Sequence, residues 1–182
     1  MASFGERYVG AMTLNVGTFE EVEADTTAMG QAVTVILIAA LASGIGNVFR
    51  NGISGLVVGT VVSLVAYVVW AALVWVIGTK VMPEPATKAD FPETFRVVGF
   101  AAAPGIANLL AIIPFLGVLI GFIVSIWMLV AMVIAVRQVL DYSSTGKAVV
   151  VCLIGFIGYW CAMFLLMLPF ISMAFVSRAG GR

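Results

Sequence analysis

Apolar residues are collected into four long runs that contain no charged side chain. The runs contain 24 residues between Asp25 and Arg50, 29 between Arg50 and Lys80, 40 between Arg96 and Arg137, and 30 between Lys147 and Arg178. About 20 apolar residues of helix cross the hydrocarbon layer of a bilayer, so three runs fit one crossing each and the longest fits two. The runs lack the alternation of barrel strands. The pattern therefore predicts an all-α fold, a polytopic membrane bundle of five transmembrane helices.

The longest run needs an internal turn that uses no charged residue. The segment Ile113-Pro114-Phe115-Leu116-Gly117 supplies one, because a proline cannot continue a helix through its own amide and Gly117 tolerates a tight reversal. Pro169 is expected to bend or end the fifth span. The resulting organisation is an N-terminal interfacial segment at residues 1–27, a five-span membrane domain at 28–176 and a short tail at 177–182.

The orientation follows from the distribution of basic residues. With five spans the termini lie on opposite sides, and the N-terminal side carries Arg7, Lys80, Lys88, Arg96, Arg137 and Lys147, against Arg50, Arg178 and Arg182 on the other side. Loops rich in Lys and Arg stay in the cytoplasm. We therefore expect a cytoplasmic N-terminus and an external C-terminus. The first helix is expected to act as an uncleaved insertion signal, because the residues before it are acidic.

The N-terminal segment mixes apolar residues with carboxylates. Thr18-Phe19-Glu20-Glu21 matches a capping box, in which the Thr hydroxyl and the Glu carboxylate each satisfy a free amide at a helix start. We expect a short amphipathic helix lying along the lipid headgroups. The alternative is a disordered acidic tail.

Composition excludes several function classes. Of the 182 residues, 63% are hydrophobic and 9 basic side chains balance 9 acidic ones, so the chain has no basic excess for binding nucleic acid. There is no histidine, which argues against haem and most transition-metal sites and excludes triads with a histidine base. No charged group lies within a predicted span, where ion-coupled pumps and intramembrane proteases need one. We expect no enzyme, no metal and no cofactor.

Small residues recur at every fourth position in two of the spans. They are Gly55, Gly59 and Ser63 in the second span and Gly117, Gly121 and Ser125 in the fourth. This spacing lets two helix backbones approach closely. The motifs indicate either a seam with another protein or copy, or packing between helices of the same chain.

A break is predicted near the middle of the third span, at Ala102-Ala103-Pro104-Gly105. Pro104 frees a carbonyl near Phe100, which Asn108 or a water could satisfy. Broken helices at the midplane form substrate sites in some transporters. Pro104 and Asn108 are therefore a possible polar site of a small permease or channel, although such kinks also simply shape bundles.

Three basic residues, Arg96, Arg137 and Lys147, stand at the predicted cytoplasmic ends of the third, fourth and fifth spans. They are interpreted either as a patch for lipid headgroups or a partner protein, or as residues that set topology by reaching to phosphates.

The stretch from Phe95 to Ile157 resembles the Yip family, the Ypt/Rab-interacting membrane proteins. The resemblance rests on Phe95-Arg96-Val97-Val98-Gly99-Phe100-Ala101, Ala103-Pro104, the turn at 113–117, Ile126-Trp127, Ala135-Val136-Arg137-Gln138-Val139-Leu140 and Ser144-Thr145-Gly146-Lys147-Ala148. The entry into the first helix at residues 25–32 is also similar. The resemblance implies a five-span bundle with a cytoplasmic N-terminus that acts without catalysis.

Two departures from the eukaryotic members matter. Those members bind Rab-type GTPases, but the long N-terminal domain and the Asp-Leu-Tyr-Gly-Pro signature are missing here. We therefore do not expect binding of a Rab-type GTPase. The short form resembles prokaryotic members and implies a bacterial cytoplasmic membrane. The expected function is that of a scaffold or accessory subunit, with membrane lipids and other membrane subunits or a second copy as partners; the alternative is the permease.

Overall fold

The computed structural model describes residues 2–113 and 115–179, which are helical with no strand. Five helical segments are long and apolar enough to cross a membrane, at Thr26–Gly46, Gly52–Val81, Phe91–Ile112, Gly117–Val139 and Thr145–Ala162. The predicted fold, a five-span all-α bundle, is confirmed.

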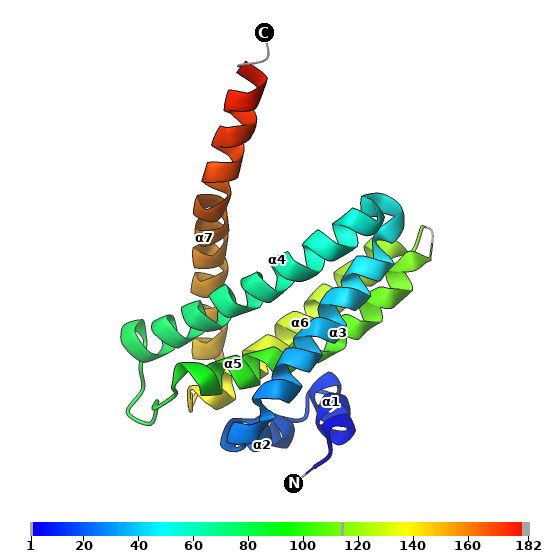
Figure 1. Ribbon diagram of the computed structural model, residues 1–182. Helices are drawn as coiled ribbons and strands as arrows, with labels where there is room; N and C mark the ends of the chain where they lie inside the picture. The colour runs from blue at the N-terminus through cyan, green and yellow to red at the C-terminus, as the bar shows by residue number, and fades with distance from the viewer. Residues whose placement is uncertain (1, 114, 180–182) are drawn as a thin grey trace.

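The elements follow in the order α1 (Phe4–Met12), α2 (Val16–Ala24), η1 (Thr26–Ala28), α3 (Met29–Gly46), α4 (Val48–Val76), η2 (Ile77–Val81), α5 (Phe91–Phe100), η3 (Ala103–Ile112), α6 (Gly117–Val139) and α7 (Thr145–Ala179). In Figure 1, α3, the α5–η3 pair and α6 lie side by side, and α4 crosses them obliquely. The helix α7 contacts α4 and α6 with its N-terminal part and then projects away at an angle. The short helices α1 and α2 cover one end of the bundle. We call α1 and α2 the cap, that end the cap end, and the opposite end the far end.

The turn between the third and fourth spans lies where the sequence predicts it. Ile113 ends η3 and Gly117 begins α6, while Pro114 lies outside the described residues. The residue in the left-handed region is Phe115, with φ 68°, and not Gly117 as expected. Gly117 is needed for another reason, because a Cβ there would lie 2.8 Å from the carbonyl oxygen of Ala111.

The helix α4 is kinked, whereas α7 is not interrupted at the position where the sequence suggests a bend or an end. Gly52 interrupts α4 with φ 66°, a conformation that glycine adopts without strain. The helix α7 runs from Thr145 to Ala179 without interruption, so position 169 does not end the fifth span.

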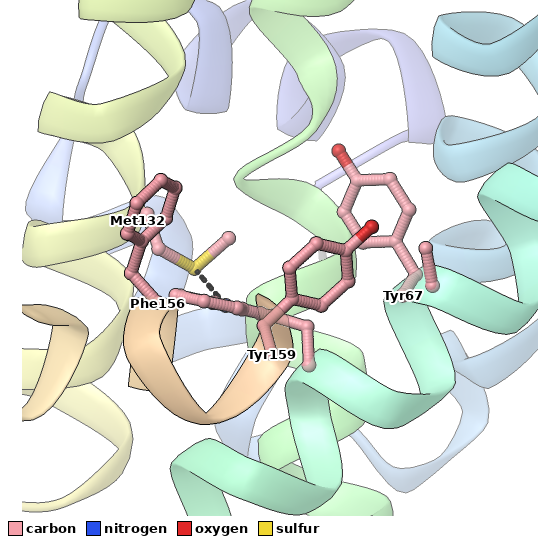
Figure 2. A pocket seen from close by; sticks show the side chains of 6 residues that line it. Tyr67, Met132, Phe156 and Tyr159 are labelled. Carbon is pink, nitrogen blue, oxygen red and sulfur yellow. Dashed lines mark hydrogen bonds between the residues drawn. The ribbon is translucent and has the colours of Figure 1, made fainter. Parts of the chain in front are cut away.

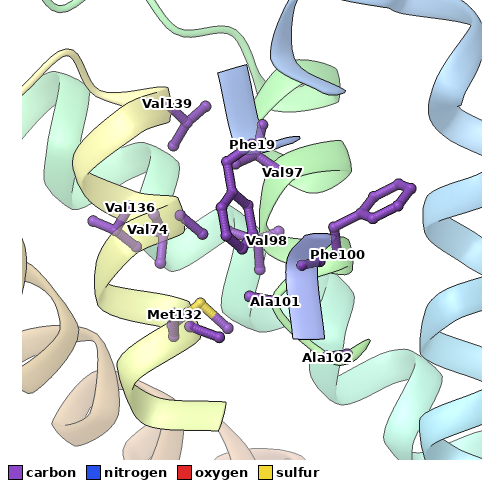
Figure 3. Close-up of a cluster of buried hydrophobic side chains, with 14 of the residues drawn as sticks. Phe19, Val74, Val97, Val98, Phe100, Ala101, Ala102, Met132, Val136 and Val139 are labelled. Atoms are coloured by element: carbon purple, nitrogen blue, oxygen red, sulfur yellow. The ribbon is translucent and has the colours of Figure 1, made fainter. Parts of the chain in front are cut away.

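The core is built mainly at the cap end. Figure 3 shows Phe19 of α2 among Val97 and Val98 of α5 and Val136 of α6. Phe19 and Val97 are completely buried. The N-terminal segment is thus helical, and its apolar side chains contribute to the bundle core.

Candidate functional site

The third span breaks at the predicted place, between α5 and η3. The α-helix ends at Phe100 and resumes at Ala103 as a 3₁₀ helix, with Pro104 in its first turn. Ala101, Ala102 and Ala103 are fully buried. The hydroxyl of Tyr8 in α1 donates a hydrogen bond of 3.1 Å to the carbonyl of Ala103. A side chain of the cap therefore satisfies a carbonyl at the break.

Asn108 does not have the expected role toward Phe100. In the part of the chain that the structure describes, its side chain makes no hydrogen bond. It lines a cavity of about 190 Å³ together with Ser43 of α3 and Ser63 and Tyr67 of α4. We call this cavity the polar chamber.

A second cavity of about 220 Å³ lies on the other side of Tyr67, between α4 and α7 (Figure 2). Trp70, Met132, Phe156 and Tyr159 line it, and the Trp70 Nε1–H donates a 3.2 Å hydrogen bond to the Sδ of Met132. Figure 2 shows the hydroxyl ends of Tyr67 and Tyr159 both turned away from the Met132 sulfur. We call this cavity the aromatic chamber.

The residues of the two small-residue motifs have different surroundings: some are open, and others contact the rest of the chain. A Cβ added at Gly59 or Gly121 would meet no atom within 4 Å. Ser125 is exposed, and its hydroxyl donates to the carbonyl of Gly121 at 2.7 Å. Ser63 lines the polar chamber instead, Gly55 is half-buried, and Gly117 lies against the turn.

The three predicted basic residues have different surroundings. Arg96 is only 5% exposed, and its Nη2 donates to the carbonyl of Glu23 at 2.8 Å, so its guanidinium holds the end of α2 and is not presented to headgroups. Lys147 pairs with Glu84 at 3.3 Å. Arg137 is exposed, with Nη1 donating to Thr145. Arg137 is thus the most accessible of the three.

The cap contains a buried ionic cluster that the sequence reasoning missed. Arg7 is 2% exposed, and its guanidinium pairs with Glu21 and with Asp25, each at 2.8 Å. Its Nη1 also donates to the side-chain oxygen of Gln31 in α3 at 3.1 Å. The one available signal was a basic residue beside the apolar Tyr8 in a segment otherwise rich in carboxylates.

The capping-box prediction at Thr18 is wrong. Asn15 is the N-cap of α2, and the Glu21 carboxylate accepts from Arg7 and from the amide of Ala2. The capping boxes found are Ser3 with Glu6 and Asp90 with Glu93. The Glu21 carboxylate, which the capping box would need, instead forms an ion pair with Arg7.

Two carboxylates of the cap have pKa values shifted in opposite directions. Hydrogen bonds from Thr27 and then from Arg7 lower the pKa of Asp25 to about 2. Burial, with Glu93 and then Asp141 nearby, raises the pKa of Glu23 to about 7. In the folded cap, burial thus opposes the charged form of Glu23, whereas hydrogen bonds favour the charged form of Asp25.

The comparison with protein-family models identifies one family. The family model described as the Yip1 domain matches residues 9–165, which includes most of the cap and all five spanning segments. Neither the curated proteins nor the solved structures contain a match to the chain. Because the match covers most of its length, the chain belongs to the Yip1 family of multi-pass membrane proteins.

Proposed function

We propose that this protein is a non-enzymatic membrane subunit that acts through lateral helix contacts, as a scaffold or an accessory subunit of a larger membrane assembly. Membership of the Yip1 family supports this, because that family is in general non-enzymatic. The partners are other membrane subunits or a second copy, surrounded by membrane lipids. Neither a nucleic acid nor a Rab-type GTPase is among them.

The observation that carries the proposal is the open space at Gly59 and Gly121. Glycines at helix contacts within this chain have a close neighbour. An added Cβ at Gly99 would lie 3.1 Å from an alanine Cβ of α3, and an added Cβ at Gly105 would lie 2.7 Å from another. Gly59 and Gly121 have no such neighbour. A glycine face that meets nothing in its own chain is suited to close contact with another helix.

The permease alternative has the polar chamber in its favour. However, the bundle between this chamber and the cap is filled, because Ala101, Ala102 and Ala103 are fully buried and Tyr8 bonds to the last of them. Ser125 lies on an exposed face and does not line the polar chamber. These contacts favour a blind cavity over a continuous pathway.

The location we propose is a bacterial cytoplasmic membrane with the cap end inside. The cap end gathers Arg7, Arg96, Arg137 and Lys147 through the contacts described above. An excess of basic residues marks the cytoplasmic side. Reporter fusions at the two termini test this orientation.

The proposal is tested by purifying the tagged protein from native membranes in a mild detergent. Gly59→Leu and Gly121→Leu should lower the recovery of the bound subunit or second copy severalfold relative to the native chain. Gly30→Leu is the matched control, since Gly30 is also open at its Cβ but lies outside both motifs. Equal recovery for all variants would contradict the proposal.

A further inference from the structure

Three cavities of the bundle lie next to one another, because neighbouring cavities share lining residues. Tyr67 lines both the polar chamber and the aromatic chamber. Trp70 and Phe156 line both the aromatic chamber and a third cavity of about 520 Å³ between α6 and α7. We call the third cavity the apolar groove. The three adjoin in a series, from one lined by polar side chains to one lined mostly by apolar side chains.

The polar chamber holds hydrogen-bonding groups without partners in the chain. The side chains of Ser43, Ser63, Tyr67 and Asn108 make no hydrogen bond to any residue that the structure describes. Over the same residues, no fully enclosed side-chain nitrogen or oxygen lacks a partner. The polar atoms of the four side chains therefore have some access to open space, and all four residues line the chamber. In the hydrocarbon region such groups require water or a polar ligand.

The chemistry of the chamber selects an uncharged ligand. Among the described residues, none that lines the three cavities is an Asp, Glu, Lys or Arg. A phosphate or an ammonium group would enter without a counter-ion, which is costly at this depth. Hydroxyl and amide groups can both donate and accept here. The chamber, at about 190 Å³, holds roughly six water-sized groups.

The apolar groove is suited to a hydrocarbon chain. Val130 and Ile134 of α6 face Val149 and Leu153 of α7 across it. Between Val149 and Phe156 the helix rises about 10 Å, so the groove is elongated along the helix. Phe156 is 55% exposed, which places the aromatic chamber at the lipid-facing surface. A ligand can therefore enter sideways from the bilayer.

We propose that the three adjoining cavities together bind one neutral lipid with a hydroxylated head, of the diacylglycerol or long-chain alcohol class. The head occupies the polar chamber against Ser63 and Asn108. The adjoining part passes Tyr67 in the aromatic chamber, and an acyl chain lies in the apolar groove. Ser43 and Asn108 lie near the far ends of α3 and η3, so the head points toward the far end and the tail toward the cap end. This binding is independent of lateral assembly.

The proposal is tested with the full chain in phosphatidylcholine nanodiscs. The probe is a diacylglycerol carrying a photoactivatable diazirine in its acyl chain, and the comparison probe is a phosphatidylglycerol with the same chains. We expect the diacylglycerol to label α6 and α7 along the groove more strongly than the phosphatidylglycerol, and unlabelled diacylglycerol to compete.

Variants of the head site and the tail site sharpen the test. Asn108→Leu and Ser63→Ala should each reduce diacylglycerol labelling about fivefold, because each removes a hydrogen-bonding group, while labelling by the charged probe stays unchanged. Val149→Trp should block the groove. Val61→Trp is the control, since Val61 is 57% exposed and lines none of the three cavities.

Three results would overturn the proposal. Equal labelling by both probes would show ordinary surrounding lipid. Unchanged labelling in Asn108→Leu and Ser63→Ala would show a chamber that holds only water. A cross-link between two copies across the groove would show that a helix, and not a lipid, fills it. Protease resistance of the cap serves as the folding check for each variant.

Discussion

The hydroxyl of Tyr8 donates a 3.1 Å hydrogen bond to the carbonyl of Ala103, a residue 95 positions further along the chain. This contact joins the first helix of the cap to the break in the third span. Both groups are buried, so the bond closes a site where the helical ladder is interrupted before Pro104. The cap and the break therefore form one structural unit.

Tyr8→Phe should loosen this unit without changing its shape. The variant keeps the ring but removes the hydroxyl that donates to the Ala103 carbonyl, at a cost of about 1 kcal/mol, or roughly 2–4 °C in Tm. Differential scanning fluorimetry in detergent and limited proteolysis of residues 2–24 measure the effect. The control is Thr13→Ala, because the Thr13 hydroxyl bonds only to carbonyls of its own helix. Equal stability of the two variants would contradict the assignment.

Arg7→Met should undock the cap. The substitution keeps an apolar stem of similar reach but leaves Glu21 and Asp25 without their cation, and breaking a buried pair lowers Tm by roughly 5–10 °C. Arg7→Lys should not restore stability, because an ammonium group lacks the planar fork that bonds to Glu21, Asp25 and Gln31 together. Lys88→Met, at an exposed position, should leave Tm unchanged. The same thermal measurement decides between these outcomes.

The stability of the folded cap should depend on pH through Glu23. Its pKa rises from 4.5 to about 7 on folding because the carboxyl is partly buried and lies near Glu93, Asp141 and Glu20, with Arg96 opposing them. The folded state thus binds more protons than the unfolded state between these values, so stability falls as pH rises from about 4.5 to about 7 and is level above that.

Glu23→Gln isolates this contribution. The variant should be more stable than the native chain at pH 8 by about 1–2 kcal/mol, after reduction for solvent screening, and the two should converge near pH 4.5. Asp25, with a pKa lowered to about 2, acts in the opposite sense and only at lower pH. Thermal unfolding of the native chain and the variant across pH 4.5–8 therefore measures the contribution of Glu23 apart from that of Asp25. Parallel curves for the two proteins would rule out Glu23 as the source.

Gly105→Ala should weaken the packing of η3 on α3. A Cβ at this position would lie 2.7 Å from the Cβ of Ala39, so the helices must separate, at a cost of about 1–3 kcal/mol. Gly30→Ala meets no atom within 4 Å and should be neutral or slightly stabilising, since alanine is the better helix former. Loss of stability in both variants, measured by thermal unfolding, would point to a general cost unrelated to this contact.

The sequence predicts the features of this fold that depend on composition and local chemistry. Five spans follow from uncharged length, and the break at Pro104 follows from the missing amide. The role of Gly105 in helix contact does not follow, because it depends on which residue of α3 lies opposite. The local pattern marks Gly105 as a residue with a flexible backbone, but it does not show which residue of α3 packs against it.

The cap could not be derived from sequence for the same reason. Its stability comes from contacts of long separation, such as Arg7 with Gln31 and Arg96 with the carbonyl of Glu23. The spacing rule that places Arg96 at a membrane surface cannot distinguish a lipid phosphate from a helix end as its acceptor. The polar chamber was equally out of reach, since Asn108 was evident in the sequence but Ser43 and Tyr67 join it only through folding.

Site-directed cross-linking in native membranes tests lateral assembly most directly. A photoreactive benzophenone residue replaces Ser125, which is exposed beside Gly121, or Ile123, which is 53% exposed on the other side of α6. The account predicts a protein adduct of defined mass from position 125, lost in Gly121→Leu, and none from position 123. Lipid adducts alone from both positions would contradict it.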